Sequence, residues 1–355
     1  MSKQLRIWLF VLLGTLLATS SLLAEGVITM TTSQPVGETI QLKIEASGSV
    51  TIDGAQYASG SDNWGHGYKY YMIKSQTVTI RGNVTQLICD YNQLTSLNVS
   101  GCTSLTKLYC QDNQLTSLDV SGCTFLSSLS CDYNQLTSLD VSKNTNLTTL
   151  NCYNNELTHL NATGCTALTM LECYGNPLTS INLSGCQSLN SFSWNSGKLT
   201  SLNVSGCTAL KWLNCSKNRL TSLDVSGCTA LTELECGNNR LTSLNVSGCT
   251  ALTKLKCQDN PLTSINLSGC QSLKSFSWNS GKLTSLYVSG CTALTKLECD
   301  YNQLTSLDVS GCTSLTTLYC YNNPLTSVKL SGCQSLKEFS WTGGKLTSLN
   351  VSGCT

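Results

Sequence analysis

"LTKLYCQDNQLTSLDVSGCTF" spans residues 105–125 and is one turn of a 21-residue repeat that fills most of the chain. The repeat is easiest to follow at its first cysteine, which recurs every 21 residues from position 89 and is replaced by tryptophan at positions 194, 278 and 341. Thirteen turns follow one another without an insertion. A short fixed period of this kind predicts a solenoid in which each coil packs only on its neighbours.

Each coil divides into two halves with the same spacing of apolar residues. In residues 105–125 the pattern Leu-x-x-Leu-x-Cys is followed by Leu-x-x-Leu-x-Val. Both patterns alternate as a short strand does, and neither half has room for a helix of ten residues. We expect two short strands per coil on opposite walls, stacked into two parallel sheets with a rise of about 4.8 Å per coil. The sequence therefore predicts a mostly β solenoid with little or no helix.

The motif Leu-x-x-Leu-x-Cys-x-x-Asn-x-Leu resembles the conserved segment of leucine-rich repeats, with cysteine at a leucine position. The doubly nested 21-residue form is similar to a bacterial class of secreted, internalin-like surface proteins, and this resemblance covers residues 84–355. It implies a right-handed rod that binds proteins or glycans, without catalysis and without a cofactor. The fold alone does not identify the partner, because it serves many functions.

The two ends of the chain differ from the repeat. Residues 1–24 are interpreted as a signal peptide, because Lys3 and Arg6 precede a short apolar run and then small residues. Its removal would leave 19 Lys and Arg against 20 Asp and Glu, a balance that argues against nucleic-acid binding and against membrane association after export. Residues 25–83 alternate like antiparallel strands and are expected to cap the core. The solenoid of residues 84–355 stops within a coil, so we expect a truncated C-terminus that is open to end-to-end association.

The 22 cysteines allow three interpretations. Their gaps alternate between 8 and 13 residues, which does not suit the clustered ligands of a metal site. Disulfides are common in exported chains, but the tryptophans divide the first series into runs of five, three and two that cannot pair regularly. We favour buried thiols, because the first series occupies an inward apolar position and the second series is replaced once by Asn144. Scattered disulfides are the alternative.

Three coils carry tryptophan in place of the first cysteine, and in each of them glycine follows three residues later. Because the replaced position points inward, we expect Trp194, Trp278 and Trp341 to repack the core. The alternative is that the indole rings turn outward and form an aromatic notch on the rod.

Outward positions vary between coils in the first half of the repeat and are nearly constant in the second. We call the outward face of the first halves the variable wall and that of the second halves the fixed wall. Tyrosine is frequent on the variable wall and is favoured in binding surfaces. We therefore expect this wall to bind an extracellular protein or glycan, as an adhesion protein would. The alternatives are a structural spacer without a specific ligand and, because of a threonine column on the fixed wall, an ice-binding face. The candidate binding residues are Tyr91, Tyr109, Tyr133, Tyr153, Tyr174, Glu172, Glu235, Lys256, Glu298, Tyr301, Tyr319 and Tyr321.

Overall fold

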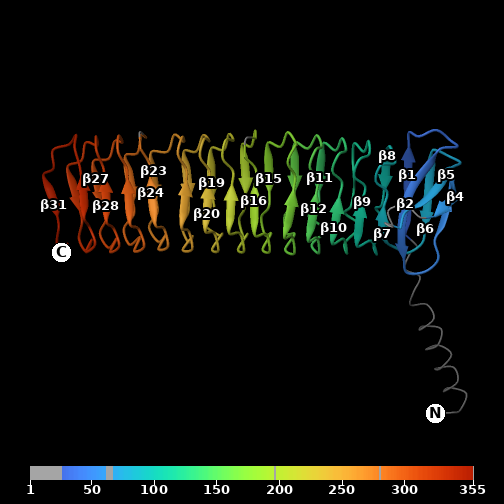
Figure 1. Cartoon of the computed structure of the whole chain (residues 1–355), viewed down its shortest axis with the longest axis horizontal. Coiled ribbons are helices and arrows are strands. Elements are labelled where there is room, and N and C mark those ends of the chain that lie inside the picture. The colour runs from blue at the N-terminus through green and yellow to red at the C-terminus, as the bar shows by residue number, and fades with distance from the viewer. Residues whose placement is uncertain (1–25, 61–66, 196, 280, 355) are drawn as a thin grey trace, which may run out of the picture.

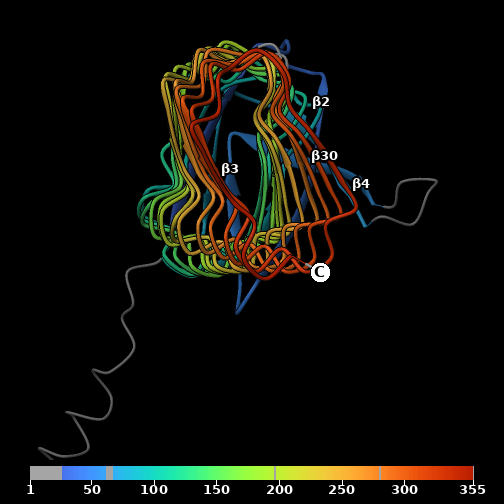
Figure 2. The same cartoon turned by 90° about the vertical axis from the view of Figure 1, so that its left-hand side faces the viewer.

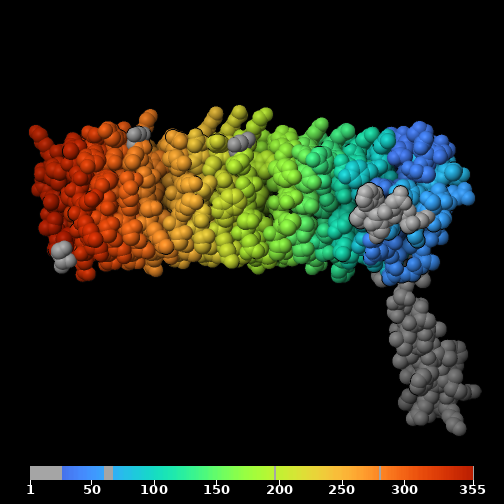
Figure 3. All heavy atoms as spheres, viewed as in Figure 1, coloured from blue at the N-terminus to red at the C-terminus, as the bar shows by residue number. Residues whose placement is uncertain are grey.

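The computed structural model describes residues 26–60, 67–195, 197–279 and 281–354, so the proposed signal peptide lies outside the described residues. These residues form a straight rod with an N-terminal cap at one end, and the coils lie side by side along its length (Figure 1). All regular elements of the described chain are strands, which confirms the predicted β solenoid. The view along the axis shows the coils stacked on one another (Figure 2), and the space-filling view shows a rod of nearly constant width (Figure 3).

The cap continues both walls of the solenoid with antiparallel strands. Strand β1 pairs with β6 and with β8 of the first coil, whereas β2 pairs with β5 and with β7. Buried side chains such as Ile28, Ile40 and Ile73 extend the apolar core into the cap. The cap therefore covers the N-terminal end of the core. Its strands are β1 (Val27–Thr32), β2 (Thr39–Ala46), β3 (Thr51–Asp53), β4 (Ala55–Gly60), β5 (Lys69–Ile73) and β6 (Thr77–Arg81).

One strand from the first half of every coil lies in the variable wall. Neighbouring strands are parallel and are offset by 21 residues, as in the pairing of Leu87 with Leu108. The strands are β7 (Val84–Ile88), β9 (Lys107–Tyr109), β10 (Ser128–Ser130), β12 (Thr149–Asn151), β14 (Met170–Glu172), β16 (Ser191–Ser193), β18 (Trp212–Asn214), β20 (Glu233–Glu235), β22 (Lys254–Lys256), β24 (Ser275–Ser277), β26 (Lys296–Glu298), β28 (Thr317–Tyr319) and β30 (Glu338–Ser340).

The fixed wall is built in the same way from the second halves. Its central apolar residues, among them Leu139 and Leu160, are buried except for Leu349 in the last strand, and the residues on either side face outward. Residues 117–119 occupy an equivalent position without a regular strand. The strands are β8 (Leu94–Asn98), β11 (Ser138–Asp140), β13 (His159–Asn161), β15 (Ser180–Asn182), β17 (Ser201–Asn203), β19 (Ser222–Asp224), β21 (Ser243–Asn245), β23 (Ser264–Asn266), β25 (Ser285–Tyr287), β27 (Ser306–Asp308), β29 (Ser327–Lys329) and β31 (Ser348–Asn350).

A column of buried asparagines satisfies the backbone at one turn of the coil. Asn113 accepts the Leu94 N–H at 2.9 Å through Oδ1, and its Nδ2 donates to the Cys89 carbonyl at 3.0 Å. The second-series cysteines take the corresponding place at the other turn. For example, the Cys123 Sγ donates to the Val99 carbonyl at 3.3 Å. This arrangement explains why asparagine and cysteine exchange at this position.

All 22 cysteines are free thiols in the structure, and all except the half-buried Cys354 are buried. Burial raises the pKa of the Cys102 thiol to about 11 and that of the Cys123 thiol to about 12. Since the thiolate is the reactive form, such thiols are chemically quiet at neutral pH. The first-series thiols behave as small apolar side chains of the core.

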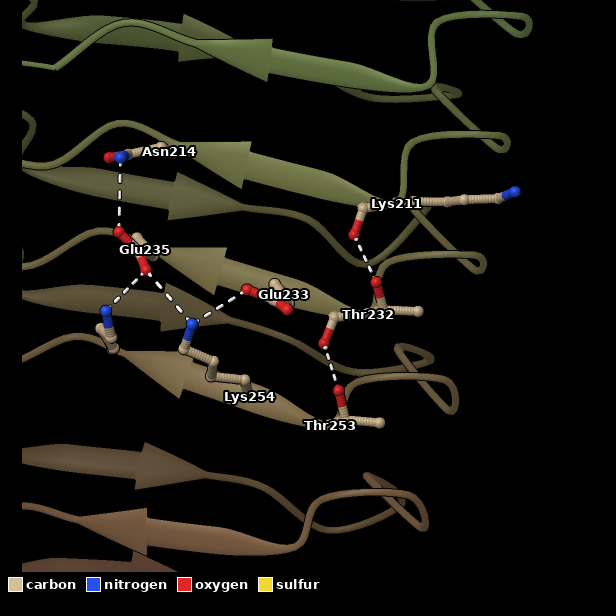
Figure 4. A network of polar contacts seen from close by, with 8 residues as sticks. Lys211, Asn214, Thr232, Glu233, Glu235, Thr253 and Lys254 are labelled. Atoms are coloured by element: carbon tan, nitrogen blue, oxygen red, sulfur yellow. Dashed lines mark hydrogen bonds and ion pairs between the residues drawn. The ribbon is translucent and has the colours of Figure 1, made fainter.

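The threonine columns hold neighbouring coils in register. The hydroxyl of Thr179 donates to the Thr158 carbonyl at 3.4 Å, and that of Thr200 donates to the Thr179 carbonyl at 3.1 Å. A second column follows the variable wall, where Thr253 donates to the Thr232 carbonyl at 3.0 Å (Figure 4). Because these hydroxyls are engaged with backbone carbonyls, the columns have a structural role.

The first two tryptophan coils are repacked internally, and Trp341 in the third is partly buried against the core. Trp194 and Trp278 are 7% and 3% exposed, which confirms the inward orientation. A side chain at Gly197 would meet the Trp194 indole, so glycine makes room for the ring. The variable-wall sheet is interrupted between β14 and β16, and a single residue pair joins β22 to β24. Strand pairing between neighbouring coils of the variable wall is therefore reduced just before the first two tryptophan coils.

Candidate functional site

The variable wall places the twelve predicted binding residues on one face of the rod. Six of them lie in wall strands, for example Tyr109 in β9 and Glu172 in β14. The other six follow the first cysteine of their coils by one or two residues. Each of the twelve is at least partly exposed. Their grouping on one surface is thus a property of the fold, whereas a ligand-binding role for them remains a prediction.

The N-terminal tyrosine cluster consists of Tyr91, Tyr109, Tyr133, Tyr153 and Tyr174. The ring of Tyr153 stacks on that of Tyr174 at a centroid distance of 4.6 Å and an interplanar angle of 10°. It also meets Tyr133 edge-on at 5.4 Å. With a rise of about 4.8 Å per coil, adjacent rings form a continuous aromatic strip across three coils.

Three tyrosines occupy backbone positions that do not favour them. Tyr91, Tyr133 and Tyr301 have φ angles of 56°, 50° and 55°, in the left-handed region. The equivalent residue in other coils is often Asn or Asp, the side chains that tolerate this region best. These tyrosines are also 61%, 49% and 59% exposed. Neither backbone conformation nor core packing therefore accounts for an aromatic ring at these positions.

Two aspartates of the N-terminal region are more buried than their sequence position indicates. We expected Asp90 and Asp132 to face outward with their neighbours, but both are only 4% exposed. Asp90 accepts hydrogen bonds from Tyr68 at 3.0 Å and from Gln111 at 3.2 Å, both at Oδ2. Burial raises the pKa of the Asp90 carboxyl. The cap, which supplies Tyr68, covers this end of the wall, and this long-range contact cannot be inferred from the repeat.

The aspartates are paired with tyrosine hydroxyls. The pKa of Tyr91 is raised by its hydrogen bond to Asp112. The pKa of Tyr153 is raised by burial and by a hydrogen bond to Asp132. In both cases a carboxylate lies beside the phenol. The N-terminal tyrosine cluster is thus a surface in which aromatic rings and carboxylates alternate.

In the middle of the variable wall, ion pairs connect side chains of neighbouring coils (Figure 4). The Lys256 ammonium lies 2.7 Å from Glu235, and Lys254 lies 3.0 Å from Glu233. The Glu235 carboxylate also accepts the Asn214 amide at 3.3 Å, and Lys256 lowers the pKa of Glu235. The charges of the predicted residues Glu235 and Lys256 therefore neutralise each other. This ion-paired region lies between the N-terminal tyrosine cluster and the tyrosines at positions 301, 319 and 321.

The C-terminal tyrosine cluster consists of Tyr301, Tyr319 and Tyr321. The rings of Tyr319 and Tyr321 lie 5.9 Å apart, and the Tyr319 hydroxyl donates to Glu338 at 2.6 Å. Glu298, the remaining predicted residue, pairs with Lys296 at 2.8 Å. This cluster is smaller than the N-terminal one and contains no stacked pair among the rings described.

Shallow hollows follow the fixed wall, where the sequence did not predict a site. One of them has a volume of 660 Å³ and is lined by residues that include Lys143, His159 and Asn182. Similar hollows lie beside it at Ser201 and at Asp119. The short Ser and Asn side chains leave this wall hollowed between its turns. The repeat pattern shows these small residues but does not show the curvature of the coil.

Other classes of site find no support in the described part of the chain. No group of three His, Cys, Asp or Glu side chains there is arranged to hold a metal ion. Within the same residues, the structure contains no helix with the length and apolar character of a membrane span. The feature that stands out is an extended surface of aromatic and charged side chains on the variable wall.

Comparisons with known proteins agree with this architecture. A family model described as "Leucine Rich repeats (2 copies)" matches residues 208–248 and 292–338. No curated protein is significantly similar to the chain. The functional domain of InlJ from Listeria monocytogenes, described as including a cysteine ladder, is 31% identical over 76% of this chain and 71% of that one, with a TM-score of 0.41. YopM from Yersinia enterocolitica is 23% identical, and the match covers 75% of this chain and 57% of that one, with a TM-score of 0.46. An internalin (inlF) from Listeria monocytogenes is 21% identical, with coverages of 75% and 86% and a TM-score of 0.35.

Proposed function

We propose that this chain, which belongs to the internalin-like leucine-rich repeat proteins, is exported and binds an extracellular protein or glycan through the variable wall. In this role it would act as an adhesion protein at or outside the cell surface. The wall offers a rigid surface, whose residues are set at fixed spacings by the coil-to-coil hydrogen bonds.

The observation that carries the proposal is the presence of exposed tyrosines at left-handed backbone positions. Tyr91 and Tyr133 contribute little to the core, and Asn would adopt their left-handed backbone conformation at a lower energetic cost. Because these tyrosines do not stabilise the fold, we infer that they contribute to binding. Tyrosine supplies contact area and a polar tip with few rotatable bonds, which suits an interface.

The test is a binding screen against extracellular proteins and glycans with two matched variants. Tyr133→Ser/Tyr174→Ser removes two exposed rings from the variable wall. Phe125→Ser/Tyr287→Ser removes two rings of similar exposure, 63% and 54%, from outside the N-terminal tyrosine cluster. We expect a ligand that binds the intact rod and the second variant but not the first.

Other outcomes would redirect the proposal. A ligand lost only in the second variant would place the site outside the variable wall. The absence of any ligand for the intact rod would favour the alternative role of a structural spacer. Circular dichroism of both variants would show that each still folds.

A further inference from the structure

We infer that the N-terminal part of the variable wall recognises the guanidinium and ammonium groups of a basic protein segment. This inference rests on the proposed function and specifies the chemistry of the partner. The surface concerned is the first half of each of the first five coils, which we call the acidic wall and which contains residues 84–93, 105–114, 126–135, 147–156 and 168–177.

Charge is distributed unevenly along the variable wall. The acidic wall carries five carboxylates, at positions 90, 112, 132, 156 and 172, against the single base Lys107. The first halves of the remaining eight coils carry twelve Lys and Arg against six Asp and Glu. A cationic ligand is therefore attracted to the N-terminal end of the variable wall and repelled by the rest of that wall.

An independent observation is an excess of hydrogen-bond acceptors. Three buried side-chain oxygens in the acidic wall have no hydrogen-bond partner: Asp90 Oδ1, Gln111 Oε1 and Asn151 Oδ1. Asp90 is itself only 4% exposed, and its other oxygen is already bonded to Tyr68 and Gln111. A buried carboxylate oxygen without a donor is costly, so a cationic group bound nearby would stabilise this end of the wall through its charge.

The aromatic rings favour a ligand whose cationic groups can stack on them. Arg and Lys carry only donors, and a guanidinium group can stack on an aromatic face while it donates to a carboxylate. The strip of Tyr133, Tyr153 and Tyr174 lies beside the exposed Glu172, so that an aromatic face and a carboxylate are both available to one ligand group. Arginine is expected to bind better than lysine, because its planar group both stacks and donates in a fork.

The experiment uses a fluorescein-labelled nona-arginine peptide and measures binding to the full chain by fluorescence anisotropy. Asp112→Asn/Glu156→Gln/Glu172→Gln removes three charges from the acidic wall. Asp119→Asn/Asp140→Asn/Asp224→Asn removes the same charge from the fixed wall, where Asn already occupies equivalent positions such as Asn161. Both variants keep the shape of the side chains and are expected to fold.

We expect the acidic-wall variant to bind nona-arginine at least tenfold more weakly, and the fixed-wall variant to lose less than twofold. Nona-lysine should bind the intact chain more weakly than nona-arginine, and nona-glutamate should not bind. Equal losses in the two variants would show diffuse attraction and overturn the inference, as would equal binding of nona-glutamate. An extracellular partner that has no basic segment and is lost in Tyr133→Ser/Tyr174→Ser would overturn this inference but not the proposed function.

Discussion

The asparagine column makes a quantitative prediction about stability. Asn134 is 8% exposed, accepts the Leu115 N–H at 2.9 Å and donates to the Cys110 carbonyl at 3.0 Å. Asn134→Ala leaves the buried Leu115 N–H without a partner, whereas the Cys110 carbonyl keeps the hydrogen bond from Asn113 at 3.0 Å. At about 1–3 kcal/mol for an unsatisfied buried group, the substitution should lower the free energy of unfolding by about 1–3 kcal/mol.

Asn144 provides a matched control with the opposite expectation. It is fully buried, and its Nδ2 donates to the Val120 carbonyl at 2.9 Å, while its Oδ1 has no partner. Asn144→Cys installs the residue found at this place in the other coils. The thiol would keep the bond to Val120, as Cys165 does to Val141 at 3.3 Å, and the unpaired oxygen would be removed. The stability should change by less than about 1 kcal/mol.

The assay is urea unfolding followed by circular dichroism, combined with hydrogen exchange of the Leu115 amide. In Asn134→Ala this amide should exchange much faster, because coils in a solenoid are coupled mainly to their neighbours. Equal stability changes in Asn134→Ala and Asn144→Cys would refute the reasoning that hydrogen bonding fixes these positions.

Three further predictions follow from the core and the coil contacts. Nearly all 22 thiols should react with a thiol reagent at pH 8 in denaturant without reductant. Almost none should react in the native protein, because burial shields the thiols and raises their pKa values. A small number of reactive thiols in denaturant would reveal disulfides. Gly197→Ala should cost about 1–3 kcal/mol by overpacking against the Trp194 indole, whereas Gly101→Ala, where a methyl group meets nothing within 4 Å, should be nearly neutral in the same thermal unfolding measurement. The amides of Cys173 and Cys257 should exchange with solvent faster than the amide of Cys152, which donates to the Glu172 carbonyl at 2.8 Å. The described structure shows no equivalent hydrogen bond for Cys173 or Cys257, whose coils precede the first two tryptophan coils. Equal protection of the three amides would contradict the weaker pairing between coils there.

The sequence was sufficient to predict the architecture, because a strict period leaves few alternatives for the chain. The inward cysteines, the exchange of cysteine with Asn144 and the buried tryptophans all follow from which positions of the repeat point inward. The left-handed backbone at Tyr133 also had a signal in the sequence. Asp, Asn and Gly occur at the same column in other coils, as Asp112, Asn154 and Gly175 do.

Features that depend on contacts between distant segments could not be predicted. The burial of Asp90 results from the cap, where Tyr68 reaches across to the wall. The hollows on the fixed wall depend on the curvature of the coil between its turns, and the pattern of Ser and Asn residues does not specify that curvature. The ion pairs of Lys256 and Lys254 depend on which charges meet across neighbouring coils, and they became clear only once the register was known.

The most direct test of the variable wall as a binding surface is hydroxyl-radical footprinting of the rod with and without a ligand from the screen. Tyr91, Tyr133 and Tyr174 on the variable wall are 61%, 49% and 54% exposed, and Tyr57 in the cap and Tyr287 on the fixed wall are 57% and 54% exposed. All five rings should therefore be oxidised to a similar extent in the free protein. A ligand bound to the variable wall should protect the first three rings and leave the oxidation of Tyr57 and Tyr287 unchanged. Protection confined to Tyr57 or Tyr287 would contradict a binding surface on the variable wall.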